Sequence, residues 1–232
     1  MKMKEQIKPK KTKLIKNRIK TMEISNGLTE EGVFIGNVYN KYDSKNLIVR
    51  FLMKNFNDSL SDFVASVAPK RIHEIGCGEG FWAIQWNKKG IQATGSDFSK
   101  KIIEVAKINA KSHKLSPKIF YVRNIYDLKP ELDSSELIVC CEVLEHLEKP
   151  NLALLSLQSV TENYLILSVP REPIWRMLNI VRGKYLGSFG NTPGHVQHWS
   201  CKRFINLVSR YFDVEEVRKP LPWTMLLCKV KT

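Results

Sequence analysis

Short apolar runs alternate with amphipathic segments along most of the chain. Strand-like runs lie near residues 71–76, 92–97, 118–123, 136–141 and 163–169, and helix-like spacing separates them. Such alternation predicts parallel strands joined by right-handed crossovers. Two more strand-like runs, near 211–217 and 223–230, have only Lys219-Pro220-Leu221-Pro222 between them, which fits an antiparallel hairpin at a sheet edge. The pattern predicts an α/β fold with a seven-stranded, mostly parallel sheet.

Helical segments flank this pattern at two informative places. Runs with helical spacing precede the first strand, one with apolar positions at 47–56 and a second at 60–67. After the fifth strand lies an insertion, 171–200, in which Pro173 opens an amphipathic segment. Its apolar face contains Ile174, Met177, Leu178, Val181 and Tyr185. Because ligand crevices of open α/β sheets lie at the carboxyl ends of strands, the insertion is either a lid that selects a substrate or a helix packed on the core.

Composition and charge indicate one globular domain with a basic tail. A length of 232 residues suits one domain, which we place at 25–232, after a tail at 1–24. The contents of 43% hydrophobic and 26% charged residues are ordinary for a soluble protein. Of the net charge of +14, the first twenty residues supply +8, from eight Lys, one Arg and one Glu. Such a segment is most often a solvated arm. The alternatives are that it binds anionic lipid or that it binds nucleic acid.

Targeting signals and cysteine usage point to the cytoplasm. No apolar stretch of sufficient length follows the N-terminal lysines for a secretory signal, and no run approaches the length of a transmembrane helix. The five cysteines are an odd number without framework spacing, and Cys77, Cys140 and Cys141 fall in predicted core elements, as expected for reduced thiols. No C-x-x-C pair exists, which argues against a cysteine zinc site.

A glycine-rich turn follows the first predicted strand. The stretch from His73 to Gly80 reads E-x-G-x-G-x-G from Glu74 onward, and Asp97 closes the next strand. Glycine lets the backbone approach a ligand without a Cβ in the way, and a carboxylate at the end of the second strand can accept both hydroxyls of a ribose. The turn therefore predicts a nucleoside-binding site.

This order of motifs resembles the class I S-adenosylmethionine-dependent methyltransferases over roughly residues 35–230. The resemblance implies a Rossmann-like fold with helices on both faces of the sheet, one antiparallel edge strand and S-adenosylmethionine as cofactor. It places Glu74 near the methionine amino group, Asp97 on the ribose, Phe98 against adenine, Asn124 at the adenine edge and Ile125 on the other adenine face. The remaining implied cofactor contacts are Gly76, Cys77, Gly78, Gly80 and Cys141. Many relatives have Asp where Asn124 stands, which puts the contact with the adenine amino group in doubt. Tyr39 and Tyr42 either cover the cofactor or pack against other side chains of the protein.

A second motif, E-x-x-E-H, follows the fourth strand, at the start of a predicted helix. Glu142, Glu145 and His146 are spaced i, i+3 and i+4, so that on a helix they would share one face. The motif resembles that of the ubiquinone-biosynthesis O-methyltransferases and of the small-RNA 3′-terminal 2′-O-methyltransferases. The latter bind Mg²⁺ through the two Glu and the His of E-x-x-E-H and through a later histidine that lies four residues before a Trp-Thr pair. His195 lies four residues before Trp199-Ser200 and so matches that ligand, whereas His198 does not.

The resemblance therefore implies a metal site of Glu142, Glu145, His146 and His195, able to take Mg²⁺, Mn²⁺, Zn²⁺ or Fe²⁺. Without a metal, His146 is the expected general base, with His195 or His198 as the alternative. E-x-L-E-H also occurs in class I methyltransferases of many specificities, where it serves packing or capping.

Three functions follow from these motifs. The first is O-methylation of a small-molecule, sugar or lipid-linked acceptor, for which the apolar stripe 174–185 and the cationic tail suit an anionic membrane surface. The second is 2′-O-methylation of an RNA end, although no RNA-binding module is present. The third is a catalytically silent S-adenosylmethionine-binding partner. The oligomeric state is left open.

Overall fold

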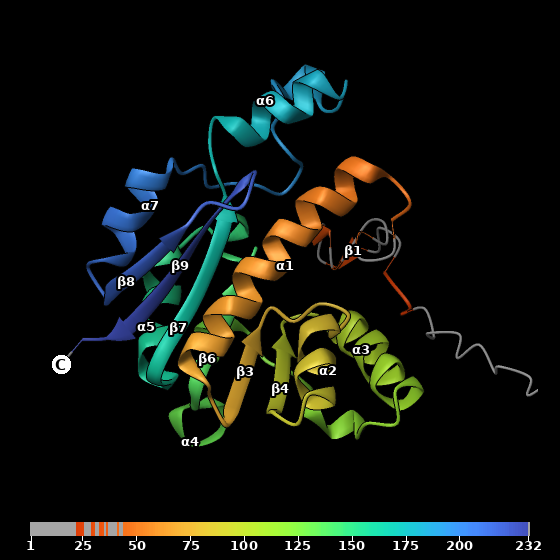
Figure 1. The fold of residues 1–232 in the computed structure, drawn as a ribbon, viewed down its shortest axis with the longest axis vertical. Coiled ribbons are helices and arrows are strands. Elements are labelled where there is room, and N and C mark those ends of the chain that lie inside the picture. The colour runs from red at the N-terminus through yellow and green to blue at the C-terminus, as the bar shows by residue number, and fades with distance from the viewer. Residues whose placement is uncertain are drawn as a thin grey trace, which may run out of the picture.

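A computed structural model of the protein describes residues 22–25, 29–30, 33–34, 36, 41 and 44–231. Its centre is a seven-stranded sheet in the order β5-β4-β3-β6-β7-β9-β8 (Figure 1). All neighbouring pairs from β5 to β7 are parallel, whereas β9 runs antiparallel to both β7 and β8. The strands are β3 Arg71–Ile75, β4 Gln92–Asp97, β5 Phe120–Val122, β6 Ser135–Cys141, β7 Thr161–Pro170, β8 Phe212–Arg218 and β9 Trp223–Val230.

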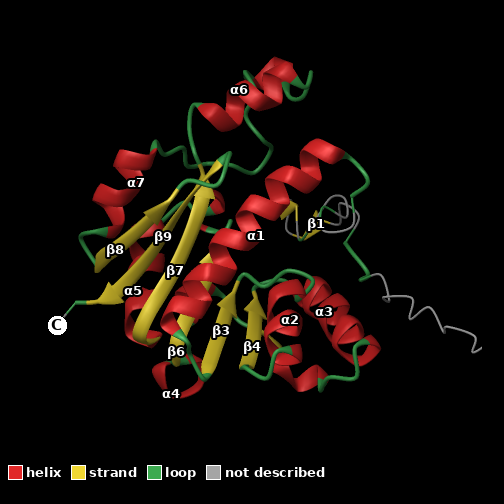
Figure 2. Ribbon diagram, in the orientation of Figure 1, coloured by secondary structure: helices red, strands yellow, loops and turns green. Residues whose placement is uncertain are grey.

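Helices cover both faces of the sheet (Figure 2). One core cluster joins the sheet to α1, α2 and α3, and a second joins it to α5 and α7. The helices are α1 Leu47–Val67, α2 Phe81–Lys88, α3 Lys100–Ser112, α4 Pro130–Asp133, α5 Pro150–Val160, α6 Ile174–Val181 and α7 Cys201–Val208. The short 3₁₀ turns are η1 Pro117–Ile119, η2 Ile125–Asp127, η3 Leu144–His146 and η4 Leu186–Ser188. This is the Rossmann-like, doubly wound arrangement that the alternation of segments predicts.

All seven predicted strands form, and the predicted hairpin is the β8–β9 pair. The two helical runs before the first strand are one continuous helix, α1, which is capped by the Asn46 side chain and ends at Ala68 with positive φ. A pair of two-residue strands, β1 Thr29–Glu30 and β2 Val33–Phe34, precedes it. Tyr39, Tyr42 and most of the basic tail lie outside the described residues.

The insertion 171–200 leaves the sheet after β7 and returns to the same place. Arg171 forms a bridge with Trp199, and the Glu172 N–H donates to the Trp199 carbonyl at 2.9 Å. Between these ends α6 stands away from the sheet (Figure 1). Its apolar face is not buried, because Met177 is 59% and Val181 82% exposed. In the part of the chain that the structure describes, no helix combines the length and apolarity needed to cross a bilayer.

Candidate active site

The glycine-rich turn connects β3 to α2 at the carboxyl end of the sheet. Its first amides, those of Gly76 and Cys77, donate to the Ser96 carbonyl at 2.8 and 3.0 Å. Gly76, Gly78 and Gly80 all have positive φ, but for different reasons. A Cβ would lie 2.3 Å from Val143 at Gly76 and 2.3 Å from Phe120 at Gly80, whereas at Gly78 no atom of the described residues lies closer than 4.0 Å. Gly78 is therefore the glycine at which a ligand can approach the backbone, and the other two permit close packing.

Asp97 ends β4 opposite this turn. Its Oδ2 accepts the Gly78 N–H at 3.1 Å, and its Oδ1 accepts the Ser99 N–H at 3.1 Å. Burial raises the pKa of Asp97 to about 6, and the two amide hydrogen bonds oppose that rise. A carboxylate offers about four lone-pair positions, so it can also accept a hydrogen bond from a ribose hydroxyl. The neighbouring Phe98 is 43% exposed and can lie against a base.

Glu74 lies inside the site rather than at its rim. Its Oε2 accepts the N–H of Ala83 in the first turn of α2 at 2.9 Å, and its side chain is almost fully buried. Burial raises the pKa of Glu74 to about 8. A carboxyl group in this state gains from a nearby cation, which is what the ammonium group of a methionine moiety supplies.

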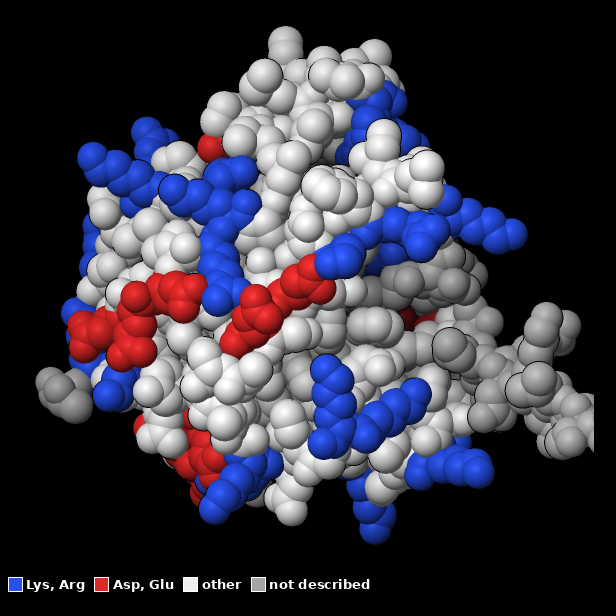
Figure 3. Space-filling view, viewed as in Figure 1, with Lys and Arg blue, Asp and Glu red and all other residues white. Residues whose placement is uncertain are grey.

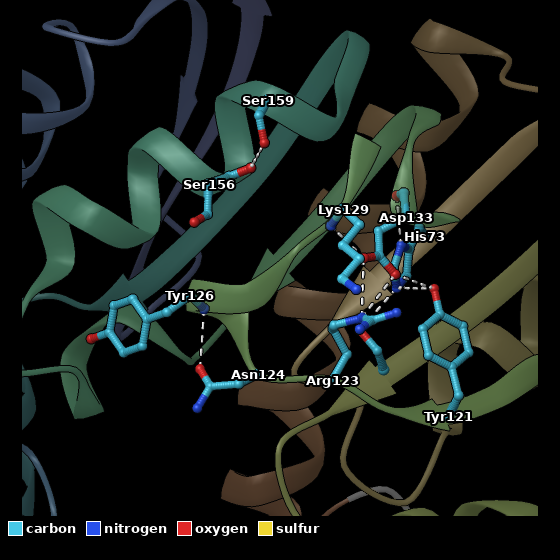
Figure 4. Close-up of polar contacts among 10 residues, drawn as sticks. His73, Tyr121, Arg123, Asn124, Tyr126, Lys129, Asp133, Ser156 and Ser159 are labelled. Carbon is cyan, nitrogen blue, oxygen red and sulfur yellow. Dashed lines mark hydrogen bonds and ion pairs between the residues drawn. The ribbon is translucent and has the colours of Figure 1, made fainter. Parts of the chain in front are cut away.

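Three other expected cofactor contacts have local structural roles. The Asn124 Oδ1 accepts the Tyr126 N–H at 3.1 Å and caps η2 (Figure 4), so a contact with adenine would come from its Nδ2. Ile125 is only 6% exposed and belongs to the core cluster that contains Ile75. Cys141 ends β6 half-buried, and burial raises its thiol pKa strongly.

The E-x-x-E-H motif does not start a helix, and that expectation is wrong. Glu142 has φ 58°, residues Leu144–His146 form the 3₁₀ turn η3, and α5 begins only at Pro150. With this left-handed backbone conformation, the Glu142 side chain has other partners than those of Glu145 and His146. Its carboxylate accepts the Ser168 hydroxyl at 3.0 Å and the Trp223 indole N–H at 2.6 Å.

Glu145, His146 and His195 are nevertheless brought together. Their ligand atoms lie within 4.8 Å of one another, and the two imidazole centroids are 4.9 Å apart. Backbone contacts fasten the insertion here, because the Glu145 carbonyl accepts the N–H groups of Val196 and Gln197 at 2.9 and 3.0 Å. Of the four expected metal ligands, three form this group and Glu142 lies outside it.

The two imidazoles of this group are neutral, whereas Glu145 must lose a proton to bind a cation. Glu145 is 2% exposed, and neither side-chain oxygen has a hydrogen-bond partner among the described residues. Burial, and then the neighbouring Glu142, raise the pKa of Glu145 well above its usual range. Burial lowers the pKa of His146, and burial, then His146 and His198, lower that of His195 to about 3. The His146 Nδ1 donates to the Gly194 carbonyl at 2.9 Å, which leaves Nε2 as a lone-pair donor. A buried carboxylate without partners, beside two neutral imidazoles, has the chemistry of a metal-binding group.

Two tryptophans and one histidine complete the surroundings. His198 Nε2 pairs with the Asn191 Oδ1 at 2.7 Å, and this histidine is not a member of the three-residue group. Trp175 stacks on His195 with centroids 5.8 Å apart, and Trp223 lies 5.9 Å from Trp175. Sequence reasoning missed both tryptophans, because Trp223 meets Glu142 from 81 positions away and no local spacing announces such a pair.

Comparisons with known proteins agree with the fold. A family model described as "Methyltransferase domain" matches residues 68–177, which include the glycine turn, Asp97 and E-x-x-E-H. This match covers just under half of the chain, and the fold of the described residues is that of the class I S-adenosylmethionine-dependent methyltransferases.

Among individual proteins, the chain is 30% identical over 146 residues to the mitochondrial ubiquinone biosynthesis O-methyltransferase of Schizosaccharomyces pombe, covering 58% of this chain and 53% of that one. The chain spans between a third and about half of the length of such curated relatives.

Two solved structures share the fold. Magnesium protoporphyrin IX methyltransferase from Synechocystis PCC 6803 with bound S-adenosylhomocysteine (SAH) has a TM-score of 0.62 at 17% identity, over 81% of this chain and 89% of that one. The methyltransferase domain of bacterial-CtHen1-CN has a TM-score of 0.59 at 20% identity, over 77% and 100%.

Proposed function

We propose that the protein transfers a methyl group from S-adenosylmethionine to the hydroxyl of a small-molecule, sugar or lipid-linked acceptor, and that Glu145, His146 and His195 hold a divalent cation beside that hydroxyl. The observation that carries the proposal is the Glu145 carboxyl group, which is buried without a hydrogen-bond partner among the described residues and has a ligand atom within 4.8 Å of those of two neutral imidazoles. A buried carboxylate without partners is costly, so the group stays protonated, as the raised pKa of Glu145 indicates, unless a bound cation compensates its charge.

The residues divide the reaction into positioning and proton handling. Gly78 and Asp97 orient the nucleoside, and Glu74 binds the ammonium group of the cofactor at the carboxyl edge of the sheet. Alignment of donor and acceptor can contribute about 7–11 kcal/mol, because the sulfonium already makes the methyl group reactive. A hydroxyl acceptor must also lose a proton, and a bound divalent cation would lower the pKa of that hydroxyl.

The donor set favours some cations over others. Two imidazoles and one carboxylate are typical of Zn²⁺, Mn²⁺ or Fe²⁺ sites, whereas Mg²⁺ prefers oxygen ligands. Glu142, which accepts from Ser168 and Trp223, would have to leave those partners to add a second carboxylate. Mg²⁺ therefore needs that rearrangement, and the other three ions do not.

Replacement of Glu145 by Gln tests the metal, with Glu148→Gln as the matched control on an exposed residue of the same segment. Turnover should fall by about a hundredfold in Glu145→Gln, while SAH affinity stays within about twofold, because the group acts on the acceptor. A chelator should abolish wild-type turnover, and added Zn²⁺, Mn²⁺ or Fe²⁺ should restore it. Full turnover in excess chelator would refute the metal and leave His146 as the general base, with His195 or His198 next in line.

The insertion supports an acceptor presented at an anionic membrane surface. Leu186 and Phe189, in and directly after η4, are 60% and 76% exposed, next to the exposed Met177 and Val181 of α6. Residues 173–200 contain three basic and no acidic residues. This end of the molecule is largely uncharged, with basic side chains beside it (Figure 3). An apolar protrusion flanked by cations is suited to insert among anionic headgroups.

Vesicle binding separates this role from that of an ordinary lid. The protein should bind phosphatidylglycerol vesicles more tightly than phosphatidylcholine vesicles and lose affinity with salt. A double Val181→Ser, Phe189→Ser variant should bind about tenfold more weakly, since each side chain loses part of about 1.5–3 kcal/mol of burial. Equal binding of the variant and the wild type would remove α6 and η4 from any membrane contact.

Methylation of an RNA end is the second candidate. The grouping of Glu145, His146 and His195 also supports it, because a ribose 2′-hydroxyl poses the same proton problem. Turnover with labelled S-adenosylmethionine on lipid extracts and on short RNAs distinguishes the two. Binding of the cofactor without turnover on either would favour a catalytically silent partner protein.

A further inference from the structure

A buried polar network lies beneath the glycine turn, at the junction of β3, β4, β5 and α4 (Figure 4). His73 of β3 is 1% exposed and has both ring nitrogens engaged: Nδ1 with the Asp133 carbonyl at 2.8 Å, and Nε2 with the Ser96 hydroxyl at 2.9 Å. The Tyr121 hydroxyl lies 3.2 Å from Nε2 and 3.0 Å from the Asp133 Oδ1. Arg123 pairs with the same carboxylate at 3.1 Å. None of these residues belongs to the methyl-transfer site described above.

The partners assign the protons of this network. The Asp133 carbonyl can only accept, so His73 must carry its proton on Nδ1. A neutral imidazole then has a lone pair on Nε2, which the Ser96 hydroxyl meets as donor. Burial lowers the pKa of His73, in agreement with the neutral ring. The Tyr121 proton goes to Asp133, so every buried polar group of the network has a partner.

Ser96 is the point at which the network reaches the cofactor region. Its backbone carbonyl accepts the N–H groups of Gly76 and Cys77, which form the start of the glycine turn. Its neighbour in β4 is Asp97, whose carboxylate accepts the Gly78 N–H. Ser96 therefore sets the position of the glycine turn relative to the expected ribose carboxylate. An apolar residue at position 73 would fill a strand interior without needing partners, but it would leave Ser96 without an acceptor.

We propose that His73 is a positioning residue for cofactor binding, which fixes Ser96 through its Nε2 and so sets the spacing between the glycine turn and Asp97. The proposal rests on the cofactor half of the proposed function. His73 touches no substrate and takes part in no chemical step. Because fully satisfied buried networks define one arrangement of the elements that they join, the loss of the contact to Ser96 should loosen the site more than the fold.

Isosteric variants separate the two ends of the imidazole. His73→Asn keeps a donor where Nδ1 lies and loses the acceptor for Ser96. His73→Gln places an amide oxygen near Nε2 and loses the donor to Asp133. Ser96→Ala removes the hydroxyl itself, and Tyr121→Phe removes one hydroxyl of the same network but leaves the pair of His73 and Ser96 intact.

Calorimetry with SAH and thermal unfolding of each variant form the test. His73→Asn and Ser96→Ala should bind SAH about tenfold more weakly, as expected for one buried hydrogen bond with its partner left unpaired. His73→Gln and Tyr121→Phe should stay within about twofold of wild type although they unfold at similarly lowered temperatures. If His73→Asn does not fold, Ser96→Ala carries the same comparison.

Two results would overturn the proposal. One is wild-type SAH affinity in Ser96→Ala or His73→Asn. The other is a loss of affinity that follows the loss of stability across all four variants, Tyr121→Phe included, because that would be a purely structural role. A wild-type protein that does not bind SAH would contradict the proposed function instead, so the two failures are distinguishable.

Discussion

Replacement of Asp97 by Ala removes the carboxylate expected to hold the cofactor ribose. In the free protein this carboxylate already accepts the amides of Gly78 and Ser99, both at 3.1 Å, so it is oriented before any ligand arrives. A hydrogen bond to a charged acceptor contributes roughly 1.5–3 kcal/mol. The Asp97→Ala variant should therefore bind SAH about ten- to a hundredfold more weakly than the wild type.

Pairing the variant with a modified ligand isolates the ribose contact. Adenosine carries the 2′- and 3′-hydroxyls of the ribose, and 2′,3′-dideoxyadenosine carries neither of them. If Asp97 binds these hydroxyls, the substitution should weaken adenosine binding strongly and dideoxyadenosine binding little, a non-additivity that calorimetry measures directly. Asp213→Ala, an exposed residue on the edge strand β8 far from β4, is the matched control.

The pH dependence adds an independent check. Because burial raises the pKa of Asp97 to about 6, the group is ionised at pH 7.5 and protonated at pH 5. Ribose hydroxyls donate better to the ionised form, so wild-type affinity should fall as the pH decreases through about 6, and Asp97→Ala should lack that fall. Equal losses for both ligands, or an unchanged pH profile in the variant, would show that Asp97 only supports the loop.

Three further predictions concern the same domain. At pH 7, SAH binding should release protons, because burial holds the pKa of Glu74 at about 8 and the ammonium group of the ligand lowers that pKa. Calorimetry in buffers of different ionisation enthalpy measures this release, and a result of no released proton would contradict the prediction. Deletion of residues 1–20 should leave SAH affinity unchanged and reduce binding to phosphatidylglycerol vesicles together with its salt dependence, and a truncated protein that melts much lower would show a structural tail. Gly76→Ala should lower the free energy of unfolding by roughly 2–4 kcal/mol, since its Cβ would lie 2.3 Å from Val143. Gly78→Ala should lower it by about 1 kcal/mol and mainly weaken SAH binding. Similar losses of stability in both variants would refute this division of roles.

The sequence by itself determined the fold class and the cofactor side of the site. Short strand-like runs separated by helical spacing mark the strands, and the glycine turn and Asp97 follow or end two strands that are adjacent in the sheet. Parallel strands place their carboxyl ends at one edge, so local pattern and topology together predict that these residues meet. The contacts of Asp97 with Gly78 and of Glu74 with Ala83 span only 19 and 9 positions.

Only the tertiary structure decided the acceptor side. Helical periodicity placed Glu142, Glu145 and His146 on one face, but the positive φ of Glu142 and the 3₁₀ turn after it redirect the first carboxylate to Trp223, 81 positions away. The apolar face of α6 has the same pattern whether it is buried or exposed, and its exposure depends on how the insertion returns to Trp199. These outcomes depend on contacts between distant segments, whose geometry is set by the packing of the whole sheet, and no spacing along the chain encodes them.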